Sequence, residues 1–99
     1  MATRPQGCKI TSFTSSGAVV ASTILNKNVY GVTIATSGAT AGETISLSDS
    51  SGGTVRWTGY VEVVTGTRHY DFGRYGINFP AGIYVNITGA SKIVSVVWD

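Results

Sequence analysis

Charged residues are scarce in this 99-residue chain. Lysine, arginine, aspartate and glutamate make up 12% of it, against about 25% in an ordinary soluble domain. The net charge of +2 comes from basic residues scattered along the sequence. Nucleic-acid binding needs a concentrated basic stripe, so the composition predicts no nucleic-acid partner.

Cysteine and histidine each occur once. A single cysteine, Cys8, excludes a disulfide within the chain, and such a residue is usually a small buried apolar side chain. One cysteine and one distant histidine, His69, cannot form a structural zinc site. The acidic residues also lack the spacing of a calcium loop. The sequence therefore predicts no metal and no other cofactor.

Long apolar runs are absent as well. No stretch of about 18 apolar residues occurs, so we expect no transmembrane helix and no membrane partner. Residues 1–7 have no apolar segment after the positive charge of Arg4, so a signal peptide is not predicted. This segment is short and polar and contains Pro5. We predict a flexible arm over residues 1–7 that orders on binding, followed by a β-sandwich domain over residues 8–99.

Serine, threonine and 13 glycines supply much of the polarity that charge does not. A surface of such residues loses little solvation and little side-chain entropy when a partner covers it. Interface centres are depleted in charge for the same reason. We interpret the composition as that of an assembled protein, with a monomer kept soluble by its hydroxyl groups as the alternative.

Alternation with a period of two dominates the sequence, and no helical period is sustained. Turn signals rich in Gly, Ser and Asn separate short segments of Val, Ile, Thr and aromatic residues. Short strands at such spacing predict an all-β, single-domain fold, a small antiparallel β-sandwich or a jelly-roll-like barrel. The predicted strands cover residues 8–14, 18–25, 28–37, 43–48, 54–63, 67–72, 75–79, 82–88 and 91–98.

The last predicted strand is apolar on both of its faces. Val94, Val96 and Trp98 can face the core, with Ile93 and Val97 on the opposite side. Either this strand is central and covered on both sides, or its second face meets another subunit.

The densest group of functional side chains lies late in the chain. Arginine and tyrosine are preferred contact residues, because they bury a large area and make directional hydrogen bonds. We therefore predict an interface that uses Arg68, His69, Tyr70, Arg74 and Tyr75, together with Arg4 and Pro5 of the arm. The alternative is an exposed hairpin with no such role.

Catalysis is poorly supported. His69 and Asp71 share one face of a strand, so the aspartate can orient the imidazole as a base. No nucleophile motif accompanies them, and we predict that the chain is not an enzyme. A second alternative is a carbohydrate-binding or host-attachment module that stacks sugars on aromatic side chains, namely Trp57, Tyr60, Tyr70, Tyr75, Tyr84 and Trp98.

Two stretches carry a resemblance to known proteins. Residues 28–38, NVYGVTIATSG, precede a short strand over residues 44–49, and residues 79–89, FPAGIYVNITG, precede a closing apolar strand. This order resembles small β-sandwich structural proteins of tailed bacteriophages. In that family a Tyr-Gly-Val strand precedes a Ser/Thr/Gly-rich loop, and a late Gly-Ile-Tyr-Val segment precedes the last strand. The resemblance covers residues 9–98.

The resemblance implies a part of a virion, assembled in the cytoplasm of the host cell. The first expectation is a capsid decoration or cement protein that binds the outer surface of a phage head. Such a protein acts as a homo-oligomer, for example a trimer, with the major capsid protein as its partner. The alternative within the same class is a tail, neck or head-fibre component. The resemblance implies no catalytic residues.

Overall fold

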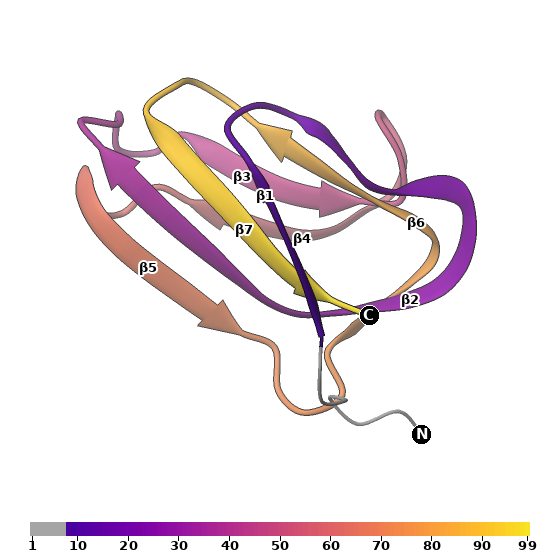
Figure 1. The fold of residues 1–99 in the computed structure, drawn as a ribbon. Coiled ribbons are helices and arrows are strands. Elements are labelled where there is room, and N and C mark those ends of the chain that lie inside the picture. The colour runs from indigo at the N-terminus through magenta and orange to yellow at the C-terminus, as the bar shows by residue number, and fades with distance from the viewer. Residues whose placement is uncertain (1–7) are drawn as a thin grey trace.

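The computed structural model describes residues 8–99, in which the alternating segments form seven strands (Figure 1). They are β1 (Lys9–Phe13), β2 (Gly17–Ser37), β3 (Thr44–Ser48), β4 (Val55–Tyr60), β5 (Thr65–Asp71), β6 (Ile77–Ile87) and β7 (Lys92–Trp98). Within these residues no helix is long and apolar enough to cross a membrane. The predicted arm lies outside the described residues.

All strand pairs are antiparallel and belong to one continuous sheet, in the order β1-β7-β2-β6-β3-β4, with β5 also paired to β2. The sheet folds into two layers because β2 takes part in both. Residues 17–29 of β2 pair with β6, whereas residues 31–37 lie between β7 and β5. One layer thus contains β1, β7, the second half of β2 and β5, and the other contains β6, β3 and β4 (Figure 1). The predicted all-β antiparallel fold is confirmed.

The core lies between the inner faces of the two layers. Val94 and Val96 of β7 are buried, as predicted, and so are Tyr30, Val32 and Ile34, which share one face of β2. Burying one such side chain contributes roughly 1.5–3 kcal/mol. The apolar cluster consists of Val29, Val32, Ile34, Ala39, Ile45, Leu47, Val61, Phe79, Ile83, Val85, Val94 and Val96.

Two predicted turns are wrong. Residues 26–28 and 80–82 were expected to separate strands, but the chain continues through them within β2 and β6. Asn26 and Gly82 have the positive φ angles of turn residues, 57° and 85°. Gly82 lies opposite a bulge of β2, where the β2–β6 register shifts between Val20 and Leu25, and Asn26 directly follows that bulge. The bulge bends β2, and Figure 1 shows the strand curving around one end of the fold, with β6 paired to it on both sides of the shift.

The region after β4 also differs from the prediction. The strand expected over residues 54–63 ends at Tyr60, and the expected turn at Thr65 and Gly66 is the beginning of β5. Val61 leaves the strand because its backbone bonds to the loop before β3, where its N–H donates to the Glu43 carbonyl and its carbonyl accepts from the Gly42 N–H. The start of the connection from β4 to β5 is thereby tied to the segment that precedes β3.

Candidate functional site

The layer of β1, β7, β2 and β5 has an outer face made from three rows of side chains. Successive side chains on a strand point to opposite faces, so the neighbours of the buried β2 and β7 residues point outward. The strand registers place them in rows across the sheet: Ile10, Val97, Gly31 and Asp71; Ser12, Ser95, Thr33 and His69; and Ile93, Ala35 and Thr67. We call these residues the outer face.

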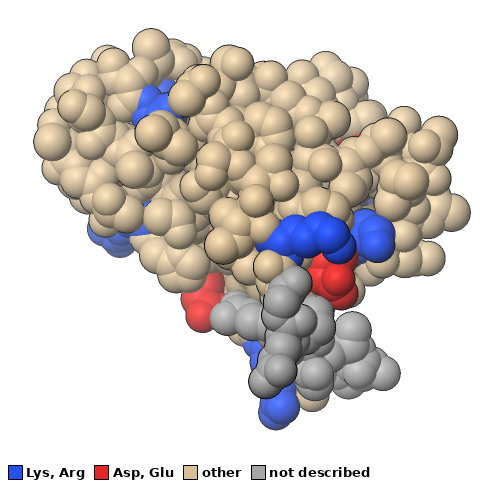
Figure 2. Space-filling model, in the orientation of Figure 1, with Lys and Arg blue, Asp and Glu red and all other residues tan. Residues whose placement is uncertain are grey.

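The outer face carries almost no charge. Among its residues only Asp71, on the edge strand β5, has a formal charge at neutral pH. Figure 2 views this layer from outside and shows a broad uncharged area, with most of the visible charged side chains along its lower border. Depletion of charge on a surface favours its burial against a partner.

Apolar and paired polar groups fill the outer face. Ile10 is 67% exposed and Ile93 is 48% exposed. The hydroxyls of Ser12 and Ser95 are 2.8 Å apart and hydrogen-bonded to each other. Covering a polar group costs little when its hydrogen bond is already made within the protein. Removing water from this part of the outer face therefore costs little free energy.

Charged side chains elsewhere are mostly paired with one another. Arg56 binds both carboxylate oxygens of Asp49, through its Nε at 2.6 Å and its Nη2 at 2.8 Å. These hydrogen bonds lower the pKa of the Asp49 carboxyl and raise the pKa of the Arg56 guanidinium. Arg68 lies 3.0 Å from Glu62. Neither pair lies on the outer face, so the charge is kept away from it.

A shallow groove of about 670 Å³ lies at one end of the outer face. It is bordered by the turn after β1, by the end of β2 and by the turn between β6 and β7. Its lining consists of Thr14, Ser15, Ala35, Thr36, Ser37, Gly89, Ala90, Ser91, Lys92 and Ile93. Apart from Lys92, the lining side chains are small or apolar and uncharged.

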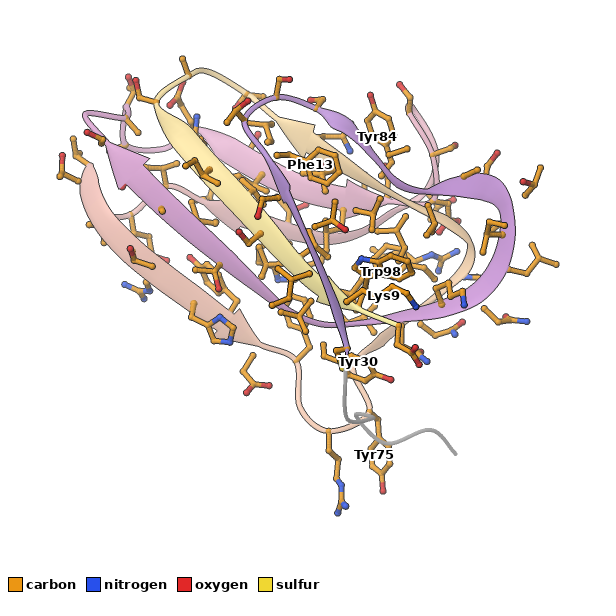
Figure 3. All side chains as sticks on the ribbon, in the orientation of Figure 1. Lys9, Phe13, Tyr30, Tyr75, Tyr84 and Trp98 are labelled. Carbon is orange, nitrogen blue, oxygen red and sulfur yellow. The ribbon has the colours of Figure 1, made fainter. Side chains whose placement is uncertain are left out.

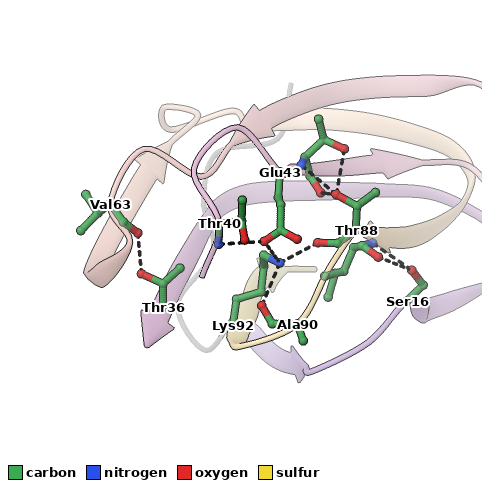
Figure 4. A network of polar contacts seen from close by, with 10 residues as sticks. Ser16, Thr36, Thr40, Glu43, Val63, Thr88, Ala90 and Lys92 are labelled. Atoms are coloured by element: carbon green, nitrogen blue, oxygen red, sulfur yellow. Dashed lines mark hydrogen bonds and ion pairs between the residues drawn. The ribbon is translucent and has the colours of Figure 1, made fainter. Parts of the chain in front are cut away.

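The charge of Lys92 is held inside the protein (Figure 4). Its side chain is buried, and its Nζ donates to Glu43 Oε1 at 3.0 Å and to the carbonyls of Thr88 and Ala90 at 2.6 and 3.1 Å. Glu43 also accepts the backbone N–H of Thr40. The hydrogen bond from Lys92 lowers the pKa of the Glu43 carboxyl. This network fixes the loops that border the groove while keeping the ammonium away from its surface.

The structure divides the predicted interface residues between different surfaces. His69 lies on the outer face, where its Nδ1 is 2.7 Å from Thr33 Oγ1. Tyr70 points to the other side of β5, in edge contact with Trp57, with ring centroids 5.3 Å apart. Burial, together with the charge of Glu62, raises the pKa of Tyr70. Arg68 lies on the same side as Tyr70 and pairs with Glu62.

The remaining predicted residues lie elsewhere. Arg74 and Tyr75 lie in the turn between β5 and β6, where the guanidinium is 5.7 Å from the tyrosine ring (Figure 3). Arg4 and Pro5 fall outside the described residues. The residues that sequence reasoning grouped together therefore do not form one surface within residues 8–99.

Three of the aromatic side chains predicted for sugar stacking, Trp57, Tyr70 and Trp98, are engaged within the fold, whereas Tyr60 and Tyr75 are 56% and 44% exposed. Trp57 packs against Tyr70 and Phe72, each with a centroid distance of 5.3 Å. Trp98 donates its Nε1 hydrogen to Thr11, and the Lys9 ammonium lies 5.1 Å from its ring (Figure 3). These rings serve packing within the described fold.

His69 and Asp71 are the pair named above as a candidate base and its orienting carboxylate. His69 and Asp71 share the outer face, as the alternation predicted, but they lie on an exposed edge strand. No group of three His, Cys, Asp or Glu side chains within the described residues could hold a metal ion. The arrangement is suited to contact with a partner.

Sequence reasoning missed most of the outer face, because its residues are individually unremarkable. The part that the sequence did indicate is the second face of the closing strand, with Ile93, Ser95 and Val97, which was expected to be covered or to meet another subunit. What the sequence could not show is that β1 and β2 place further uncharged residues beside this strand.

Comparisons with known proteins assign no family. No family model matches the sequence, and no curated protein matches it. Among solved structures, a chain of the T13 IBDV viral particle shows 19% identity and a TM-score of 0.22. The match covers 99% of this chain and 22% of that chain. A TM-score of this size does not define a common fold.

Proposed function

We propose that this chain is a structural protein of a virion, a decoration or cement protein that binds the outer surface of a phage head. In this role it acts as a homo-oligomer, has the major capsid protein as its partner and catalyses no reaction. The observation that carries the proposal is the outer face, on which Asp71 at the edge strand is the one residue with a formal charge. The assignment to a phage rests on the resemblance of residues 28–38 and 79–89 to small phage structural proteins.

The energetics of the outer face suit repeated, modest contacts. Each copy offers exposed apolar side chains, Ile10 and Ile93, beside small neutral residues. Their burial yields roughly 25 cal/mol for each Å² of apolar surface, and the one charged residue, Asp71, lies on the edge strand, where it can stay in water. A shell presents many equivalent sites, so weak contacts made together become strong binding. The same argument holds for a tail, neck or head-fibre component, which is the second candidate position.

Adding one charge to the outer face tests the proposal. Ser12 is exposed on the edge strand β1, and Ser12→Arg would place an unpaired guanidinium in the contact. We expect at least a 10-fold loss of affinity for phage heads in a co-sedimentation assay, because burying that charge costs more than about 1.4 kcal/mol.

The matched control is Thr58→Arg. Thr58 is also an exposed hydroxyl residue on an edge strand, but it lies in the other layer. This variant should bind heads like the unmodified protein. Equal binding by both variants would show that the outer face is not the contact. Binding of the unmodified protein to purified tails but not to heads would select the second position.

A further inference from the structure

The single histidine of the chain, His69, lies exposed on the outer face, in the row that contains Thr33 and Ser95. Its Nδ1 is 2.7 Å from Thr33 Oγ1. Its ring fills the space that a side chain at Gly31 would take, since a Cβ there would lie 3.1 Å from His69 Cε1. The imidazole is therefore held along the surface of the sheet, over β2, where a partner on the outer face would cover it.

One charged residue accompanies this ring on the outer face. The positions around His69 on this face are Gly31 and Thr33 of β2, Ser95 and Val97 of β7, and Thr67 and Asp71 of β5. Among these only Asp71 has a formal charge at neutral pH. Its Oδ1 accepts the backbone N–H of Gly73 at 2.8 Å, which orients the carboxylate toward the turn after β5. The two groups share the edge strand, but only the imidazole is bonded to the neighbouring strand β2.

The charge of this surface depends on acidity. Histidine is the side chain that changes its charge between about pH 5 and pH 8. A protonated imidazole must lose water when a partner covers it, and burial disfavours the charged form of a titratable group. Binding and protonation are linked, so a contact that disfavours the proton is itself weakened by the proton to the same extent. Affinity should therefore be highest where the imidazole is neutral and should fall as the pH decreases.

We propose that the contact between the outer face and the phage head is sensitive to pH through His69, with tight binding near neutral pH and release in acid. This inference rests on the proposed function, because it names a regulation of the same contact. The hydrogen bond to Thr33 and the open position at Gly31 set where the charge appears, which is over the sheet and not in the surrounding solvent.

The test compares the unmodified chain with His69→Gln in co-sedimentation with phage heads at pH 7.5 and pH 5. Glutamine is uncharged at both values, and its amide can also bond to Thr33. The heads titrate over this range as well, but their contribution is common to both chains. We expect the unmodified chain to lose at least about 10-fold more affinity on acidification than His69→Gln. Equal losses in the two chains would overturn the inference.

Asp71→Asn is the matched control on the same strand. It removes the one formal charge of the outer face, and its amide oxygen can still accept the N–H of Gly73. This variant retains the imidazole and should keep the loss of affinity in acid. A pH response that disappears in Asp71→Asn and persists in His69→Gln would assign the response to the carboxylate and overturn the inference.

A second measurement uses the unmodified chain and needs no variant to fold. Calorimetry of head binding at pH 6.5, in two buffers that differ in ionisation enthalpy, counts the protons exchanged on binding. The inference predicts a net release of protons, since the contact favours the neutral imidazole; a net uptake, or no exchange, would contradict it. Failure to bind heads at either pH would overturn the proposed function, whereas equally tight binding at pH 7.5 and pH 5 would overturn the inference alone.

Discussion

Gly82→Ala is expected to destabilise the protein by about 3 kcal/mol, which lowers the melting temperature by roughly 12–24 °C for a domain of this size. Gly82 has a φ of 85°, where an L-residue costs about 1–2 kcal/mol. A Cβ at this position would also lie 2.6 Å from the Asp49 carbonyl oxygen and 2.7 Å from Ser22 Cα. These are backbone atoms that cannot move aside without disturbing the bend of β2 or the end of β3, and such overpacking adds about 1–3 kcal/mol.

Gly52→Ala separates the two causes of this loss. Gly52 has a φ of 75°, but no atom lies within 4 Å of the Cβ that alanine would add. It should therefore cost only the backbone term, about 1 kcal/mol. Thermal unfolding followed by circular dichroism measures both variants. Equal losses at the two glycines would mean that the close packing between β2 and β6 at the bulge contributes nothing to stability.

Lys92→Met is the second substitution with a large expected effect. It leaves the carbonyls of Thr88 and Ala90 and the carboxylate of Glu43 without the donor they share. Hydrogen bonds to a charged group are worth about 1.5–3 kcal/mol, and we expect a loss of about 2–3 kcal/mol in urea unfolding. Lys27→Met, on a half-buried lysine of β2, is the control and should change stability by less than about 0.5 kcal/mol.

The same variant should change the response to acid. The Lys92 hydrogen bond lowers the pKa of Glu43 in the folded protein. The folded state therefore gains stability above the ordinary carboxylate pKa and loses it as the pH falls through the lowered value. Unfolding measured from pH 7 to pH 3 should show a smaller acid-induced loss in Lys92→Met and in Glu43→Gln. An unchanged pH dependence in both would show that this ion pair does not couple to folding.

The fold class follows from the sequence because period-two alternation reflects the geometry of a strand directly. The buried positions of β2 and β7, such as Val32, Ile34, Val94 and Val96, could be predicted for that reason. The bends at Asn26 and Gly82 could not. A residue with a positive φ can lie in a hairpin turn or at a bend within a continuous strand. The strand pairing of β2 shows which of the two is present, and the sequence does not contain that pairing.

The candidate site was harder to predict than the fold. Arg68, Tyr70 and His69 are adjacent in sequence, and alternation sends them to opposite sides of β5. The outer face instead combines β1, β7, β2 and β5, which the sequence separates widely. Its defining property is the absence of charge over neighbouring strands, and that property exists only once the strand order is known. The groove likewise combines the turn after β1, the end of β2 and the turn between β6 and β7.

Ion pairs such as Arg56–Asp49 and Lys92–Glu43 hold the loops without adding charge to the outer face or to the groove lining. A small domain can thus present several neutral surfaces and remain folded through its core.

Hydroxyl-radical footprinting of the protein, free and bound to phage heads, tests the central claim most directly. Ile10 and Ile93 report on the outer face, Tyr60 on the exposed side of the other layer, and Tyr75 on the turn between β5 and β6. We predict strong protection of Ile10 and Ile93 on binding, with Tyr60 and Tyr75 still oxidised. Protection of Tyr60 or Tyr75 with Ile10 and Ile93 unchanged would contradict the assignment of the outer face as the contact surface.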